Sequence, residues 1–283
     1  MISSSDLPDI QQTKPKILRP ICQVGVENIE APFKLELKSG GFYDTISKTS
    51  LRTNLDKDTK GISMSRLLLT LKKYLHLPLK HSLLKKILVD LSNTIGSTES
   101  FIKFDFKIPV DRKSPLTDNI FPIYHNCQFQ GLLFNDSFKF YQTVVFQYAS
   151  YCPCSTELCH DLNKKGETGS PHAQRSYATV VIESHINEYI WLEDIIQLLE
   201  NSISTLPYPI IKRVDEQEIA RIASLNPIFV EDAVRMISDS LDSYNKIKDW
   251  YVKCVHEESI HTSEAVAFNY KGVKGGFDEK NFL

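Results

Sequence analysis

The hydrophobic period changes in the same order twice along the chain, and this restricts the fold more than any other feature. In the first half, apolar and polar residues alternate in FKLELKSGG, as in a half-buried strand. Apolar residues then recur every three or four positions in ISMSRLLLTLKKYLHL and LKHSLLKKILVDLSNTI, which are separated at Pro78. Alternation returns in FIKFDFKIPV. This half is therefore predicted to be strand, helix, helix, strand.

The second half begins near residue 120 with two runs rich in aromatic and β-branched residues. These runs, FPIYHNCQFQGLLF and SFKFYQTVVFQYASY, predict a hairpin that turns at residues 135 and 136. A further strand is expected at RSYATVVIESHI. The second half therefore also starts with strands.

Two helices and further strands are expected after this point. The helices are WLEDIIQLLENSIST and NPIFVEDAVRMISDSL, the second opened by Asn226 with Pro227 at its first position. WYVKCVHEESIHTSEAVAFNY has strand character at both ends. The chain is thus predicted to be a duplicated α+β fold. Its expected parts are an irregular N-terminal arm, two halves of similar architecture and a C-terminal tail, at residues 1–30, 31–118, 119–275 and 276–283.

Composition and charge exclude several classes of protein. With 42% hydrophobic and 24% charged residues, the chain has the composition of a globular protein that can bury its own core. The formal net charge of -2 argues against a nucleic-acid-binding surface. The N-terminus has no secretory pattern, and no apolar run is long enough to span a membrane. We expect a cytoplasmic protein, whose six cysteines are not a disulfide framework.

Three of the six cysteines lie within residues 151–176, and they could form a metal cage, a nucleophile with its base, or part of a core. If the preceding strand continues, Cys152 and Cys154 point to one face because strand side chains alternate. Pro153 then marks a sheet edge, a bulge or the strand end. Residues 155–171 are polar and contain glycine, which predicts a surface loop able to cover a site.

Imidazole, carboxylate and guanidinium groups follow this loop. His172 and Arg175 lie at the start of a predicted strand, and an arginine fork can bind phosphate or carboxylate. Glu258 and His261 are three residues apart, on one face of a helical turn but on opposite faces of a strand. If both bind one ion, the strand must break there. Near alternatives are His256, Glu257 and Glu264.

Other charged residues mark predicted helix starts. Glu216 and Glu231 lie in acidic stretches that are typical of first helical turns, where the helix dipole favours them. DKDTKGISMSR combines Lys60 and Arg66 with a glycine at a helix entry, which could hold phosphate.

Six motifs, in their order along the chain, resemble the type IB GTP cyclohydrolase family: KGISMSR, CPCS, HAQRS, KRVDE, NPIFVEDAVR and ESIH. The resemblance implies a tunnelling fold, in which each half supplies an antiparallel sheet with two helices on one side. It also implies a homo-oligomer, expected to be a tetramer, whose sheets form barrels and whose active sites lie at subunit interfaces.

The resemblance further implies a reaction and a metal. The imidazole ring of GTP would open at C8, with release of formate and rearrangement to 7,8-dihydroneopterin triphosphate, the first step of tetrahydrofolate biosynthesis. Water must attack an aromatic carbon, so a divalent zinc, manganese or iron ion is expected as cofactor. The implied ligands are Cys152, Glu216, Glu258 and His261, with His172 either a further ligand or a proton shuttle.

Catalytic and substrate-binding roles follow from the same resemblance. Cys154 matches the family's active-site thiol and is expected to act at C8. His172 would transfer protons during ring opening. Glu231 would accept hydrogen bonds from guanine N1–H and the 2-amino group. The expected triphosphate contacts are Lys60, Arg66 and Arg175.

Two other functions stay open at this level. One is a tunnelling-fold nitrile reductase, in which a cysteine attacks a nitrile and NADPH reduces the adduct. The other is a non-catalytic protein in which metal-bound cysteines only stabilise the fold.

Overall fold

The computed structural model describes residues 10–185 and 188–278. The chain divides into two compact units, and strands β3, β4 and β5 contribute residues to both. The first unit comprises residues 1–106 and 128–141, and the second comprises residues 107–127 and 142–283.

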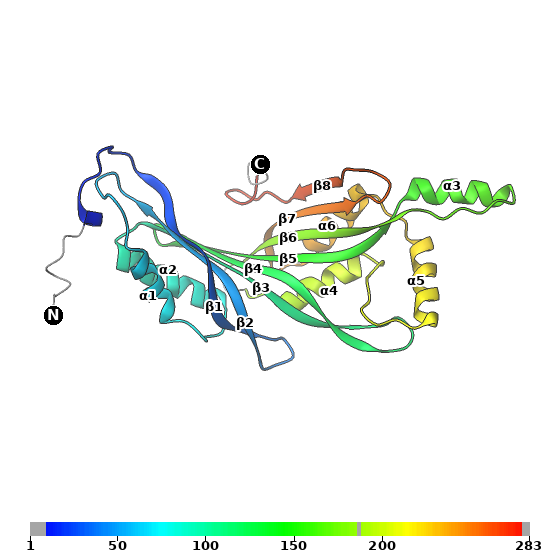
Figure 1. Cartoon of the computed structure of the whole chain (residues 1–283), viewed down its shortest axis with the longest axis horizontal. Coiled ribbons are helices and arrows are strands. Elements are labelled where there is room, and N and C mark those ends of the chain that lie inside the picture. The colour runs from blue at the N-terminus through cyan, green and yellow to red at the C-terminus, as the bar shows by residue number, and fades with distance from the viewer. Residues whose placement is uncertain (1–9, 186–187, 279–283) are drawn as a thin grey trace. The chain divides into compact units, whose positions relative to one another are not determined.

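The first unit combines antiparallel strands with a pair of helices (Figure 1). After a 3₁₀ turn η2 (Ile10–Gln12), its elements are β1 (Ile21–Glu36), β2 (Phe42–Leu55), α1 (Met64–Lys72), α2 (His81–Ile95) and parts of β3 (Glu99–Lys113), β4 (Ile120–Phe134) and β5 (Ser137–Tyr151). The expected pair of helices between strands is confirmed, but two strands precede the helices where the sequence predicted one, because β2 was not identified.

The core of the first unit follows from the two periods of its sequence. Every second residue of β1 is buried from Ala31 to Leu35, and α2 buries Leu84, Leu88 and Leu91 along one stripe. Ring centroids of Phe33 and Phe104 lie 4.9 Å apart in an edge-to-face contact between β1 and β3. Burial of each such large apolar side chain contributes about 1.5–3 kcal/mol.

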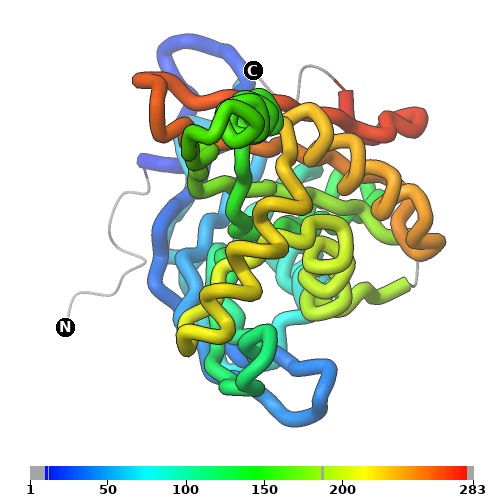
Figure 2. Tube along the Cα trace, turned by 90° about the vertical axis from the view of Figure 1, so that its right-hand side faces the viewer, coloured from blue at the N-terminus to red at the C-terminus, as the bar shows by residue number. Residues whose placement is uncertain are grey.

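The second unit has more helices than the sequence predicted. Its elements are the remaining parts of β3, β4 (Ile120–Phe134) and β5 (Ser137–Tyr151), then α3 (Pro153–Lys164), β6 (Ala173–Ser184), α4 (Leu192–Ser202), α5 (Arg213–Leu225), α6 (Val230–Asp242), β7 (Ile247–Glu257) and β8 (Ala265–Tyr270). Helices α4 and α6 lie side by side against the strands, while α3 extends from the end of β5 (Figures 1 and 2).

All eight strands pair in chain order, from β1 to β8. The hairpin between β4 and β5 turns at Asn135 and Asp136, both with positive φ, as expected from their residue types. In the β6–β7 pair, Arg175 lies opposite Glu257 and Ser176 lies opposite His256. The expected α+β class is confirmed. Within the described part of the chain, no helix is long and apolar enough to cross a membrane.

Three local expectations were wrong. Residues 155–171 were expected to be a loop, but α3 occupies most of this range because Pro153 is at the first helical position. Residues 21–30 were expected to be irregular but belong to β1, which accommodates them with register shifts. Helix α6 begins at Val230 instead of Pro227, with Phe229 as its N-cap residue.

Candidate active site

A pocket of about 300 Å³ lies in the second unit, where the end of β5, the start of β6, the start of α6 and the β7–β8 connection meet. Its polar lining combines a thiol, imidazoles, an amide and carboxylates. These side chains belong to Cys152, His172, Gln174, Glu231, His256, Glu258, His261 and Glu264. The pocket therefore brings together five residues that the sequence predicted for the site, from segments more than 100 positions apart.

The two cysteines around Pro153 have different positions. Strand β5 ends at Tyr151, so Cys152 is the N-cap residue of α3 and lines the pocket. Its backbone N–H donates to the carbonyl of His172 at 3.4 Å. Cys154 lies in the first turn of α3, where it is exposed and outside the pocket lining. The expectation that both thiols share one strand face was wrong because a helix replaces the strand at Pro153.

Gln174 connects two site residues. Its side-chain Oε1 lies 3.1 Å from Nδ1 of His172, and its Nε2 donates to Oε1 of Glu258 at 3.3 Å. Oε2 of Glu258 lies 3.7 Å from the same Nδ1. The amide is buried, and the imidazole and carboxylate side chains are each 15% exposed. The three groups form one polar cluster inside the pocket.

The strand break expected near Glu258 is confirmed. Strand β7 ends at Glu257, and the following bend allows both Glu258 and His261 to line the pocket. A continuous strand would place these two side chains on opposite faces.

His256 forms the buried wall of the pocket. Its Nε2 lies 2.9 Å from the hydroxyl of Tyr148. Burial lowers the pKa of His256 to about 4, against an opposing effect of the Glu231 carboxylate. The sequence offered His256 only as a near alternative and gave no role to Tyr148 or Gln174. Strand alternation places Gln174 and Ser176 on one face of β6, and Ser176 lies opposite His256 in β7. This alternation was the sequence signal that could have identified Gln174 and His256.

Other predicted site residues lie outside this pocket. Glu216 is exposed on α5, next to the buried Asp215. Arg175 is exposed and points to the face of β6 opposite Gln174. Lys60 is exposed in the connection between β2 and α1 of the first unit.

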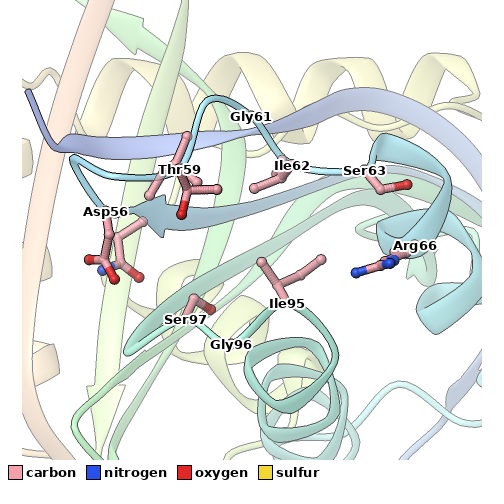
Figure 3. Close-up of a pocket in the computed structure, with 11 residues that line it drawn as sticks. Asp56, Thr59, Gly61, Ile62, Ser63, Arg66, Ile95, Gly96 and Ser97 are labelled. Carbon is pink, nitrogen blue, oxygen red and sulfur yellow. The ribbon is translucent and has the colours of Figure 1, made fainter. Parts of the chain in front are cut away.

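Arg66 lines a second, smaller cavity of about 90 Å³, which lies wholly in the first unit. Figure 3 shows its guanidinium directed from α1 toward the side where Ile95 lies. Ser63, at the N-cap position of α1, and Asp56 also line this cavity. A cation beside a helix N-terminus suits a phosphate oxygen, while Asp56 opposes one.

The first pocket contains the donor types that a divalent metal uses. Cys152, His261 and Glu258 offer sulfur, nitrogen and oxygen ligands, a mixture that zinc, manganese or iron accepts. Among residues 10–185 and 188–278, no three such side chains lie close enough together to bind one ion. The chemical types of these donors suit a metal ion, but the side chains would have to move closer together to bind one.

Comparisons with known proteins support one family. The model of the family described as type I GTP cyclohydrolase folE2 matches residues 7–267. A protein named GTP cyclohydrolase FolE2 from Thermosipho africanus is 32% identical over 259 residues, covering 92% of this chain and 96% of its own. Its namesake from Cereibacter sphaeroides is 28% identical over 273 residues, covering 95% and 76% of the two chains.

A solved structure supports the fold. The crystal structure of uricase from Arthrobacter globiformis superposes with a TM-score of 0.54 at 5% sequence identity, covering 91% of this chain and 95% of that chain. The expected tunnelling fold is thereby confirmed, and the low identity limits this likeness to the fold.

Proposed function

The chain belongs to the type I GTP cyclohydrolase FolE2 family, and from this premise we propose that it is a GTP cyclohydrolase I. The reaction opens the imidazole ring of GTP at C8, releases formate and yields 7,8-dihydroneopterin triphosphate. This product would enter tetrahydrofolate biosynthesis. The observation that carries the proposal is the pocket that collects Cys152, His172, Glu231, Glu258 and His261.

Proton transfer during ring opening is assigned to His172. An imidazole has an ordinary pKa near neutrality and can both accept and donate a proton. Its ring lies largely buried between Gln174 and Glu258, so its orientation is restricted. Hydrolysis at C8 needs a proton removed from water and protons delivered to the ring nitrogens that leave C8. One positioned imidazole can serve both needs.

Recognition of the purine is assigned to Glu231 at the start of α6. A carboxylate can accept hydrogen bonds from N1–H and the 2-amino group of guanine together. Adenine has no hydrogen on N1 and no 2-amino group, so this contact would favour guanine nucleotides. Glu231 lines the same pocket as the buried His256.

A divalent metal would be held by Cys152, Glu258 and His261. It would supply Lewis-acid chemistry at the attacked carbon. Glu216 was also expected as a ligand; it is exposed on α5, outside the lining of this pocket, and would bind the metal in the pocket of another copy. Cys152 is therefore the proposed metal ligand, whereas Cys154, which is exposed outside the pocket lining of its own chain, keeps its proposed action at C8 in the site of another copy.

The proposal also covers the triphosphate contacts, the cellular location and the assembly. Lys60, Arg66 and Arg175 are proposed triphosphate contacts, with the strongest support for Arg66 because its cavity adjoins a helix N-terminus. The enzyme is proposed to be cytoplasmic and to act as a homotetramer.

The test is turnover of GTP by the purified protein loaded in turn with zinc, manganese or iron. The expected product becomes a fluorescent pterin after oxidation, and one formate is released per GTP. ATP, which lacks the groups that Glu231 would bind, serves as the substrate control. Absence of GTP turnover with all three metals refutes the proposal, and NADPH oxidation with a deazaguanine nitrile would point to the nitrile reductase instead.

A further inference from the structure

The side chain of Gln174 contacts both His172 and Glu258, and each of its two polar atoms meets one of them. It lies in β6, two residues after His172 and on the buried face of the strand. Neither the sequence motifs nor the resemblance to the family assigned a role to Gln174.

The carboxylate fixes the orientation of the amide. An ionised Glu258 can only accept hydrogen bonds, so the group that faces it must be the NH₂ of Gln174. A flipped amide would place its oxygen against the carboxylate oxygen and lose this bond. The carbonyl oxygen of the amide therefore faces His172.

The amide orientation in turn fixes the hydrogens of His172. The amide oxygen is an acceptor and lies 3.1 Å from Nδ1, so Nδ1 must carry a hydrogen to make this contact. The second carboxylate oxygen, 3.7 Å from Nδ1, favours the same hydrogen. In a neutral imidazole with hydrogen on Nδ1, the lone pair is on Nε2.

We propose that Gln174 is a positioning residue that holds His172 as the Nδ1–H tautomer and leaves Nε2 as its basic atom. This rests on the proposed function for its catalytic meaning, because Nε2 is then the atom that accepts a proton or binds a metal. The same amide restrains the Glu258 carboxylate. One side chain thus prepares two groups of the pocket before any ligand arrives.

The test uses protein labelled with ¹⁵N-histidine and loaded with diamagnetic zinc, in which ¹⁵N shifts distinguish protonated from bare ring nitrogens. Signals of His172 are assigned by their loss in His172→Gln. We expect a protonated Nδ1 and a bare or metal-bound Nε2 in the wild-type chain. In Gln174→Met, which is similar in size but has no amide, the Nδ1–H preference should be lost.

Kinetics provide the second measurement. Loss of a side chain that orients a functional group typically lowers activity roughly 10–100-fold, so Gln174→Met should lower kcat within that range and change KM for GTP little. Gln174→Glu keeps an oxygen acceptor for Nδ1 but places a second carboxylate beside Glu258. It should retain the tautomer and still lose kcat.

Ser176→Ala is the matched control, since Ser176 is buried two residues further along the same strand and its hydroxyl bonds the hydroxyl of Ser150 at 2.7 Å. It should change neither the tautomer nor kcat. A bare Nδ1 in the wild-type chain would overturn the proposal, as would a tautomer unchanged in Gln174→Met or altered equally in Ser176→Ala. Absence of GTP turnover would refute the proposed function and leave the tautomer result standing.

Discussion

Cys152 and Cys154, on either side of Pro153, differ in exposure and therefore in expected chemistry. Cys152 is half-buried and lines the pocket, whereas Cys154 is exposed on the first turn of α3. We expect Cys152→Ala to lose most of the bound metal and nearly all turnover, because a soft ligand is removed. Cys154→Ala should keep its metal and still lose turnover, because this thiol is proposed to act at C8. Metal analysis of each purified variant, together with the GTP assay, measures both effects.

The matched pair also tests which thiol acts on the substrate. The two variants change the same atom type two residues apart, so differences between them report the position of the thiol. If Cys154→Ala kept full turnover, or Cys152→Ala kept its metal, the assignment of the action at C8 to Cys154 and of the metal to Cys152 would be wrong.

His125 makes stability depend on pH at a position far from the proposed ligands in sequence. It is buried in β4 and stacks on Phe146 at 6.1 Å between ring centroids. Burial, with repulsion from Arg112, lowers the pKa of His125 to about 4 from the ordinary value of 6.5. The folded chain therefore keeps His125 neutral where the unfolded chain protonates it.

This difference lowers the free energy of unfolding as the pH falls from about 6.5 to about 4. A shift of this size corresponds to roughly 3 kcal/mol at the acid end of the window. His125→Phe keeps the stacked ring but removes the titrating group, so its unfolding free energy should fall less steeply over this range. Urea unfolding of both proteins at several pH values measures the slopes, and equal slopes would contradict the prediction.

Among the elements, α5 is attached to the β3–β4 connection through Asp215. This buried carboxylate accepts backbone N–H groups of Leu116, Thr117 and Lys212 at 2.9–3.0 Å and the Thr117 hydroxyl at 2.5 Å. Burial alone would raise the pKa of Asp215, but these hydrogen bonds lower it to about 2. The stabilisation is therefore present above the ordinary carboxyl pKa of 3.8 and is lost as the pH falls through about 2.

Asp215→Ala should lower the thermal midpoint by several degrees at neutral pH, because it leaves three backbone N–H groups and the Thr117 hydroxyl without their acceptor. Asp215→Asn should recover part of the loss, since its amide oxygen can still accept. Differential scanning calorimetry measures both. Glu218→Ala, which removes an ion pair with Arg221 on the same helix, is the control, and an equal loss there would refute a specific role for Asp215.

Whether an element could be predicted depended on how far its signal extends along the sequence. The period of α2 persists over 15 residues, so the sequence identified this helix without knowledge of its surroundings. Helix α3 is polar and buries only Thr156 and Cys159, so no apolar stripe marked it. The Pro at its first position was read as a strand end, although proline is equally typical of a helix start.

For the whole molecule, sequence motifs predicted which residues line the pocket, but they did not predict how those residues contact one another. Cys152, His172 and Glu258 were identified, because their residue types and spacing carry chemistry. Gln174 and His256 were not assigned roles, because their importance depends on the pairing of β6 with β7, which brings positions about 80 residues apart into register. Strand register of this kind is set by tertiary packing, which local sequence patterns do not specify.

The proposed assembly gives the last prediction. Strands β1 and β8 end the strand order, and edge strands readily pair with another chain. Both carry exposed apolar side chains, with Ile21 45% and Val266 47% exposed. Contact between copies at β8 would cover Val266, so Val266→Glu should bury a charge there and dissociate the oligomer.

Light scattering should give the wild-type chain a mass several times the 32.4 kDa of one copy, and Val266→Glu a smaller mass with unchanged circular dichroism. If residues from more than one copy complete the site, GTP turnover should fall together with the mass. Leu69→Glu adds the same charge at an exposed position on α1 and should change neither quantity. A monomeric wild-type protein that turns over GTP would refute the oligomer, because its site would then be complete within one chain.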